Sequence, residues 1–332
     1  MNLRQLRYFV RIVECGSLSR AARELNLAQP ALSQQLAKLE ELVGKPLVVR
    51  TPQGVVPTEH GLALHQHAAF VLRLVEQGLA VARGGARAIQ GMVSVGLAAT
   101  TVAALGLPLV QRVRERYPGI LLNVVEGMSG HIEQMLRLGQ LDMAILFAPG
   151  LAPDLVVEPL LDEELFVVLP RTSRLVPRRR ASLTLAEAAR LPMILPTARH
   201  GLRQRVTAEL DRRGLRVEVV AEIDSLALLM ACVAAGMGAT IKPMGAILAE
   251  GGKAGRFRAL PIEDARLRRR NFLYTLPPER RSAAATAVAA ELRAVVAALL
   301  ADPARRGFEP VPEAERFGPG PESTSSTRLA AE

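Results

Sequence analysis

The chain has 332 residues, enough for two domains with sizeable cores. Its 42 Lys and Arg outnumber its 32 Asp and Glu, and the formal net charge of +10 favours contact with a polyanion. Aromatic residues make up only 3% and Trp is absent, which argues against a nucleic-acid surface built on stacked rings. The charged N-terminus lacks the apolar core of a signal peptide and no run of eighteen apolar residues is found, so we expect a cytoplasmic protein without a membrane partner.

The first predicted elements are a helix over residues 2–15 and a helix-turn-helix between Ser17 and Gly44. Ser17 is placed to cap a helix over 18–25, and the link that follows at 26–28 is short. The second helix begins near Gln29 with Pro30 in its first turn, where the missing N–H removes no hydrogen bond. Apolar residues at helical spacing predict its buried side: Leu32, Leu36, Leu39 and Leu42 or Val43.

The opposite side of this second helix is polar and suits the major groove of DNA. A helix fits the groove, Gln can bind adenine through two hydrogen bonds, and Ser can bond to a base or a phosphate. The spacing by itself also fits a surface helical hairpin with a polar outer face. On the DNA-binding interpretation, the contacting residues are Ser17, Gln29, Pro30, Ser33, Gln34, Lys38, Arg50 and Thr51.

Two short strands, at 46–50 and 55–57, surround a Thr-Pro-Gln-Gly turn and predict a wing. The wing places Arg50 and Thr51 where they can meet the DNA backbone or the minor groove.

Thr58 is predicted to cap a long helix that runs to about Ala82. Its apolar side has no obvious local partner, so we expect a dimerisation arm, although the helix could instead pack on its own domain. The segment Arg83–Gln90 contains two glycines and predicts a flexible hinge.

Four ordered strings in this region resemble the DNA-binding domain of the LysR-type transcriptional regulators. They are AA at Ala21-Ala22, QPALSQQ at Gln29–Gln35, LE at Leu39-Glu40 and PTEHG at Pro57–Gly61. The strings AQPALSQQ and RTPQGVVPTE, with GMGA later in the chain, are most similar to the nitrogen assimilation control subgroup.

The resemblance implies a winged helix-turn-helix domain over 1–58, a linker helix and hinge over 59–90 that joins copies of the chain, and an effector-binding domain behind them. Relatives often have Arg where this chain has Gln34, so we expect base preference to shift from guanine toward adenine. They often have a basic residue near the wing tip, where this chain has Gln53.

Beyond residue 90, strands and helices alternate in two sets, and the order of the first set predicts a mostly parallel sheet with helices on both faces. Two α/β halves joined by crossing strands describe a periplasmic-binding-protein-like domain over 91–300, as the resemblance also implies. The Pro-, Gly- and Ser-rich residues 301–332 predict a disordered tail. Strands are expected at 92–97, 120–126, 142–147, 155–160, 165–169, 193–195, 216–222, 239–242, 257–261 and 267–276, and helices at 105–117, 129–138, 183–190, 201–213, 225–235 and 279–300.

The string GLAATTVAALG, at Gly96–Gly106, predicts a ligand cradle at the carboxyl end of a strand. Thr100 or Thr101 could cap the next helix and leave its N–H groups facing a small anion. The threonines could also be no more than caps beside a water-filled cleft. By analogy with the family, the effector site comprises Ala99, Thr100, Thr101, Ser129, Thr197, His200, Gly201 and Ser225.

Signatures of catalysis are missing from the sequence: there is no Walker loop, no G-x-S-x-G and no HExxH, so we expect no enzyme, no cofactor and no metal site. Cys15 and Cys232 are expected to be buried free thiols. The arginine runs 178–180 and 268–270 are expected to lie in solvated loops or edges rather than on DNA.

Together these patterns predict an all-α winged helix-turn-helix domain followed by a two-lobed α/β domain. The expected function is a bacterial LysR-type transcription factor, a homodimer or homotetramer on a partly palindromic, A/T-leaning operator in double-stranded DNA. A small-molecule co-inducer and RNA polymerase are its other expected partners, and the nucleoid its location. The alternative is a small-molecule-binding protein or enzyme whose N-terminal helices serve only dimerisation.

Overall fold

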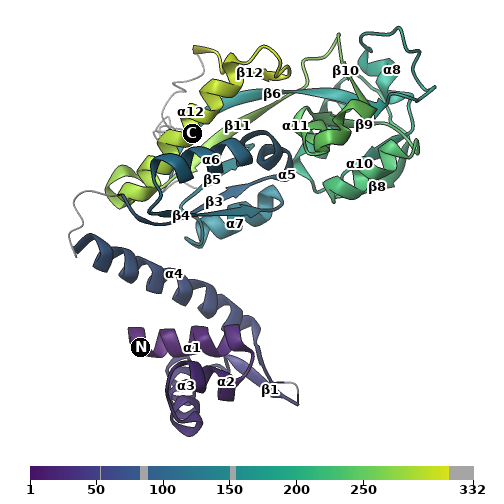
Figure 1. Cartoon of the computed structure of the whole chain (residues 1–332). Coiled ribbons are helices and arrows are strands. Elements are labelled where there is room, and N and C mark those ends of the chain that lie inside the picture. Colours follow the sequence, from purple (N-terminus) through teal and green to yellow (C-terminus); the bar gives the residue numbers. More distant parts are fainter. Residues whose placement is uncertain (53, 83–88, 150–154, 314–332) are drawn as a thin grey trace, which may run out of the picture. The chain divides into compact units, whose positions relative to one another are not determined.

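The computed structural model describes residues 1–52, 54–82, 89–149 and 155–313 (Figure 1). The chain divides into two compact units. Unit 1 comprises residues 1–98, 108–144 and 275–291, and unit 2 comprises residues 99–107, 145–274 and 292–332. The predicted hinge at Arg83–Gln90 falls largely on residues 83–88, which lie outside the described residues.

Three helices at the N-terminus share one apolar core. α1 is Leu3–Cys15, α2 is Leu18–Glu24 and α3 is Gln29–Val43. Gly44 ends α3 in the left-handed conformation, with φ of 73°. These helices were predicted to within a residue or two, because their caps and apolar spacing are local features. The core residues include Phe9, Ile12, Leu18, Ala21, Ala22, Leu32, Leu36, Leu39 and Leu47.

The wing and the linker helix follow these helices. β1 (Val48–Thr51) and β2 (Gly54–Pro57) form an antiparallel pair. α4 (Glu59–Ala82) begins after Thr58, whose Oγ1 accepts a hydrogen bond from the Gly61 N–H at 3.0 Å and donates one to the Pro46 carbonyl at 2.8 Å. Thr58 therefore caps α4 and also fixes it to the start of the wing.

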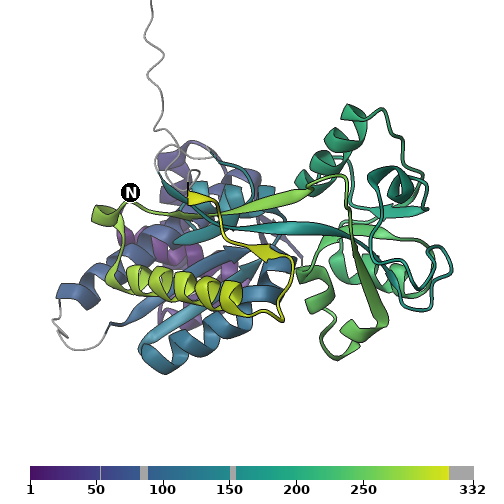
Figure 2. The same ribbon diagram turned by 90° about the horizontal axis from the view of Figure 1, so that it is seen from above.

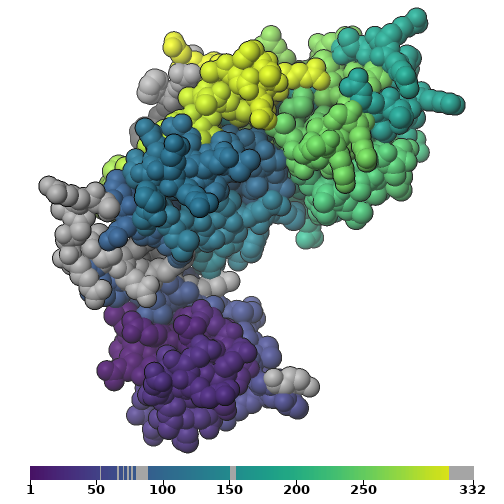
Figure 3. All heavy atoms as spheres, in the orientation of Figure 1, coloured from purple at the N-terminus to yellow at the C-terminus, as the bar shows by residue number. Residues whose placement is uncertain are grey.

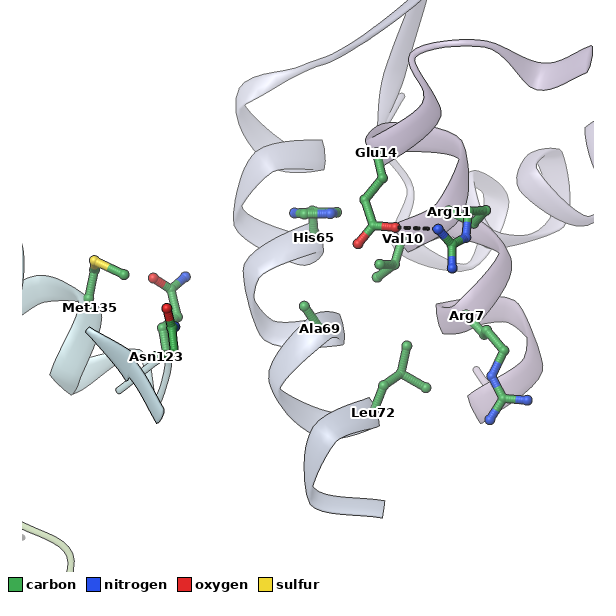
Figure 4. Close-up of a pocket in the computed structure, with 10 residues that line it drawn as sticks. Arg7, Val10, Arg11, Glu14, His65, Ala69, Leu72, Asn123 and Met135 are labelled. Carbon is green, nitrogen blue, oxygen red and sulfur yellow. Dashed lines mark ion pairs between the residues drawn. The ribbon is translucent and has the colours of Figure 1, made fainter. Parts of the chain in front are cut away.

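α4 packs along α1 over part of its apolar side (Figure 4). Leu6 and Val10 of α1 are buried against Ala68 and Leu72 of α4. The linker helix is thus partly covered within its own chain, which is the alternative that the sequence left open. Other apolar side chains of the same helix remain exposed, namely Leu62, Val71 and Leu79.

The α/β part of unit 1 has a parallel sheet. β3 (Gly91–Leu97) lies between β4 (Ile120–Glu126) and β5 (Met143–Leu146), and both pairs are parallel, as predicted. α7 (Ser129–Arg137) packs closely over β3, since a Cβ at Gly96 would lie 2.6 Å from Ile132. α6 (Leu107–Arg116) starts later than predicted because Val102–Gly106 forms a π-helical turn.

α12 (Ala283–Ala301) is long and apolar enough to cross a membrane by length and composition alone. However, 56% of that apolar window is buried within the protein. Its Glu291 is 2% exposed and bonds to Arg112 and Arg116 of α6, each at 2.8 Å, and the two helices lie side by side (Figure 2). These contacts are typical of a core helix in a water-soluble domain.

Unit 2 is built on one long strand, β6 (Val156–Pro170), which pairs with four others. Its partners are β9 (Thr240–Pro243), β10 (Phe257–Pro261), β11 (Arg268–Thr275) and β12 (Phe308–Glu309). A separate parallel pair consists of β7 (Met193–Leu195) and β8 (Val219–Glu222). The helices are α5 (Ala99–Thr101), α8 (Leu185–Ala189), α9 (Gly201–Arg212), α10 (Leu226–Ala234) and α11 (Gly245–Leu248).

The prediction of two strands at 155–160 and 165–169 was wrong, because β6 is continuous. The acidic residues that interrupt its apolar pattern are buried and paired: Asp162 bonds to Arg270 and Glu163 to Arg269. The run 268–270 was therefore also mispredicted, since these arginines lie in β11 and are ion-paired rather than solvated. Arg268 pairs with Glu309 of β12 at 2.7 Å.

The predicted disordered tail begins too early. Phe308 is 8% exposed and pairs with Glu163 across β12 and β6, and Val311 is 2% exposed. Two apolar side chains in a polar segment are sufficient to fix it on the edge of β6. Residues 314–332 lie outside the described residues.

Candidate nucleic-acid interface

The turn between α2 and α3 is set by small and left-handed residues. Ala21 and Ala22 are almost fully buried, so the two helices can cross closely. Asn26 adopts φ of 54°, a left-handed conformation that Asn tolerates better than most residues. The Leu27 N–H then donates to the Ala22 carbonyl at 2.9 Å, which ends α2 and starts the approach to α3.

α3 lies at the surface of the N-terminal domain (Figure 1 and Figure 3), and one side of it is polar. Gln29, Pro30, Gln34 and Lys38 are exposed, whereas the leucines on the other side are buried. Ala28 at the N-cap gives no side-chain hydrogen bond, so the first-turn amides of α3 remain available to an anion such as a DNA phosphate.

A hydrogen bond joins the wing to this face of α3. Arg50 Nη2 donates to Ser33 Oγ at 2.7 Å, so a predicted backbone-contacting residue and a predicted base-contacting residue touch each other. Thr51 Oγ1 donates to the Gly54 carbonyl at 3.2 Å and stabilises the hairpin. The structure thus brings Arg50 together with α3.

Ser17 has a role within its own helix. Its side chain caps α2 by accepting a hydrogen bond from the Arg20 N–H at 3.3 Å, and the residue is half-buried. Arg20 in turn donates to the Cys15 carbonyl. A hydroxyl that accepts the capping hydrogen bond can still donate its own O–H to a phosphate oxygen.

Two residues that position the wing were missed by sequence reasoning. Glu40 Oε1 accepts hydrogen bonds from the N–H groups of Leu47 and Val48, at 2.8 and 3.2 Å. Gly54 has φ of 139°, and a Cβ there would overlap the Gly16 carbonyl oxygen. The strings LE and TPQG could have signalled both, because each stands at a place where the backbone must be held or approached closely.

The predicted cradle in unit 2 is packed and polar. Thr100 Oγ1 accepts a hydrogen bond from Arg269 at 2.9 Å, and Thr101 Oγ1 is buried with no hydrogen-bond partner in the described part of the chain. Neither threonine caps a helix, so that part of the prediction was wrong. A Cβ at Gly245 would overlap the Thr100 carbonyl, which shows how closely α11 approaches Ala99–Thr101.

Four other predicted effector residues lie in unit 2. Thr197 bonds to Asp224 through its N–H and Oγ1, at 3.0 and 3.1 Å. Ser225 caps α10, while Gly201 is exposed at the start of α9. His200 caps α9 through Nδ1, and burial lowers its pKa to about 4, helped by the charges of Lys242 and Arg269 and opposed by Asp224. Ser129 begins α7 in unit 1.

The most buried charges of unit 2 were not predicted. Lys242, Arg269 and Glu163 are 4%, 4% and 2% exposed. Burial lowers the pKa of Lys242 to about 8, and the positive charge of Arg269 acts in the same direction. The signal in the sequence was a lone lysine in the apolar strand TIKP.

Comparisons with known proteins cover most of the chain. Residues 86–297 match the LysR substrate binding domain, and residues 3–62 match the bacterial regulatory helix-turn-helix protein, lysR family. The nitrogen assimilation regulatory protein nac of Klebsiella aerogenes is 40% identical over 244 residues, which cover 73% of this chain and 78% of that protein.

Solved structures share the fold. A hydrogen-peroxide-bound mutant of Corynebacterium glutamicum OxyR is 30% identical, with a TM-score of 0.56 and coverage of 90% of this chain and 94% of that one. Full-length CbnR, solved in complex with its target DNA, is 18% identical, with a TM-score of 0.68. The match covers 89% of this chain and 100% of that one.

Proposed function

The chain belongs to the LysR family of transcriptional regulators, and we propose that it reads a partly palindromic operator with α3 in the major groove. The exposed polar face of α3, with Arg50 held on it by Ser33, is the observation that carries the proposal. CbnR, which shares the fold, has been solved in complex with its target DNA. The family consists of regulators rather than enzymes, so the alternative of an enzyme is set aside.

Each DNA-facing residue has a distinct proposed role. Gln29 and Gln34 bind adenine edges, which gives the operator its A/T preference, and Ser33 bonds to a base or holds Arg50. Lys38, Arg50 and Thr51 contact phosphates, and Ser17 adds a backbone contact from α2. Pro30 keeps the first turn of α3 compact against the groove.

The protein is proposed to act as a homodimer or homotetramer. The exposed apolar side chains Leu62, Val71 and Leu79 of α4 support a second copy packing on that helix. Two copies would place two α3 helices on half-sites about one helical turn apart. The scheme assigns residues 1–58 to DNA binding, 59–90 to dimerisation and hinge, and 91–300 to effector binding.

The effector-binding domain is proposed to take a small anion. Two of its candidate residues lie near buried cations of unit 2, which supports this ligand class. Thr101 follows Thr100, which accepts a hydrogen bond from Arg269, and His200 interacts electrostatically with Lys242 and Arg269. We place the protein in the cytoplasm on the nucleoid, with RNA polymerase as a further partner.

Selection of duplexes from a random DNA pool, at two salt concentrations, tests the function. We expect enrichment of a dyad-symmetric site whose affinity falls steeply with salt. Enrichment of no sequence, both alone and with metabolite pools added, would contradict sequence-specific binding.

A further inference from the structure

Lys242 is a lysine enclosed in unit 2. It lies on β9 opposite Phe166 of β6 and is only 4% exposed. Thr240 shares its face of the strand, because alternate residues point the same way. The side chains that belong to this face of β6, Phe166 and Val168, are part of an apolar core. The ammonium group therefore sits at the edge of apolar surroundings.

The charges around Lys242 do not neutralise it. In residues 1–52, 54–82, 89–149 and 155–313, no carboxylate lies within 4.0 Å of its ammonium group. Asp224 interacts with it electrostatically, but Asp224 is exposed to water and already accepts hydrogen bonds from Thr197. The effect of Asp224 is therefore weakened by solvent.

The buried carboxylate of Glu163 is paired with another cation, Arg269. Glu163 Oε2 accepts hydrogen bonds from Arg269 Nε at 2.9 Å and from Asn271 Nδ2 at 3.0 Å. Arg269 also donates to Thr100 and stacks 3.7 Å from the centre of the Phe147 ring. Arg269 and Glu163 thus form a neutral pair, which leaves the positive charge of Lys242 in excess.

Two buried hydroxyl groups in the same unit make no hydrogen bond to any residue that the structure describes. They are Thr240 Oγ1, on the strand of Lys242, and Thr101 Oγ1, next to the Thr100 that contacts Arg269. Buried polar groups are normally satisfied, so both hydroxyls keep the capacity to hydrogen-bond to a bound group. His200 interacts with Lys242 too, and its ring is neutral at physiological pH.

We propose that Lys242 is the cation of an internal anion subsite, which takes the oxyanion group of a small ligand and includes the hydroxyls of Thr101 and Thr240. The proposal rests on the effector function proposed above and names its chemical class: one carboxylate of a metabolite, or an inorganic oxyanion. An ammonium buried without a counter-charge is unfavourable, and a bound anion removes that penalty. If Lys242 served only to fill space, its substitution would leave anion binding unchanged.

The test compares three full-length proteins: wild type, Lys242→Met, and Lys253→Met, which makes the same change at an exposed lysine. Thermal unfolding at pH 7 is followed with rising acetate, succinate, sulfate or phosphate, at ionic strength held constant with sodium chloride. Wild type and K253M should show a saturable rise in Tm with at least one anion, and K242M should bind that anion roughly ten- to a hundredfold more weakly. A response to acetate or succinate indicates the carboxylate of a metabolite, whereas a response to sulfate or phosphate indicates an inorganic oxyanion.

Calorimetric titration of the stabilising anion at pH 8, in two buffers of different ionisation enthalpy, gives a second readout. Wild type should take up protons on binding, because a bound anion raises the pKa of Lys242, and K242M should not. If K242M does not fold, K242Q takes its place in both experiments.

Three results would overturn the proposal: an equal saturable rise in K242M, no saturable rise in wild type with any of the four anions, or failure of both K242M and K242Q to fold. Operator binding by the same wild-type preparation keeps the two proposals separate. Loss of the anion response with operator selection intact refutes only the subsite, and the converse refutes only the DNA-binding proposal.

Discussion

The residues on the DNA-facing side of α3 differ in the contacts they already make. Gln29 and Gln34 are exposed and make no hydrogen bond within the described part of the chain. Ser33 instead receives a hydrogen bond from Arg50. Substitution of a glutamine should therefore remove one interaction with DNA, whereas substitution of Ser33 should also release Arg50.

Gln29→Ala should lose roughly 1–3 kcal/mol of discrimination between operator and random DNA, because a paired contact to one base is removed. Non-specific affinity should stay nearly intact. Competition binding with both kinds of DNA measures the difference, and Gln111→Ala, the same change at an exposed position of α6, is the control. Equal losses on both DNAs would contradict a base-reading role.

Arg50→Ala should weaken binding to operator and random DNA alike, and should reduce the salt slope by about one. Ser33→Ala should produce part of the same loss, because the guanidinium is no longer held. The double variant should then lose less than the two single losses added together. Strict additivity over the salt titrations would show that the Ser33–Arg50 contact has no part in DNA binding.

Lys242 should make stability depend on pH in a defined direction. Burial and Arg269 lower its pKa to about 8, against an ordinary value of 10.5, while Asp224 opposes them and His200 is neutral. Between these pH values the unfolded chain keeps a proton that the folded chain has released, so stability increases as pH rises. The gain should be on the order of 3 kcal/mol in wild type and absent in Lys242→Met. Denaturant unfolding from pH 7.5 to 10.5 measures it, and parallel curves for the two proteins would refute it.

At the scale of elements, the junction between the wing and α4 depends on a close backbone approach. A Cβ at Gly61 would overlap the Leu47 carbonyl oxygen, and Thr58 bonds to both Gly61 and Pro46 around it. The string PTEHG therefore has a physical meaning: a cap, followed three residues later by the position with no room for a side chain.

Gly61→Ala should destabilise the N-terminal domain by about 2 kcal/mol or more, because the backbone of Leu47 must move. Gly78→Ala is the matched control, since Gly78 is in the same helix and nothing lies within 4 Å of its Cβ position. That control should be neutral or stabilising by about 0.5–1 kcal/mol through helix propensity. Chemical denaturation followed by circular dichroism compares the two variants. Equal free energies of unfolding would show that the close approach at Gly61 does not limit the side chain there.

At the scale of the whole molecule, the basic charge is unevenly placed. Residues 1–58 contain eight Lys and Arg and four Asp and Glu, so +4 of the +10 net charge falls in about one sixth of the chain. The three arginines of 268–270 are neutralised by Glu309, Glu163 and Asp162. Their charges are therefore unavailable to DNA.

Replacing the exposed Arg178 and Arg179 together by Ala should leave both DNA affinity and its salt slope unchanged, because these residues lie far along the chain from α3 in the other unit. Binding at several salt concentrations, with Arg50→Ala as the positive control, measures this. A weaker salt dependence of DNA affinity in the double variant would show that unit 2 contacts the DNA.

The sequence by itself determined the helix-turn-helix, its wing and the linker helix, together with the family. Ser17, Gly44 and Thr58 act on their own helix ends, and the leucines of α3 repeat with the helical period, so each signal is complete within a few residues. The polar face of α3 could be predicted for the same reason.

Only the tertiary structure decided how the charges of unit 2 are used. Glu163 and Arg269 lie 106 residues apart, yet each removes the cost of burying the other, and this makes β6 one strand instead of two. Lys242 has no such ion-pair partner within the residues that the structure describes, and no local pattern could reveal this. The physical reason is that burial and charge pairing depend on distant segments meeting, whereas caps and helical periods depend on neighbours in the chain.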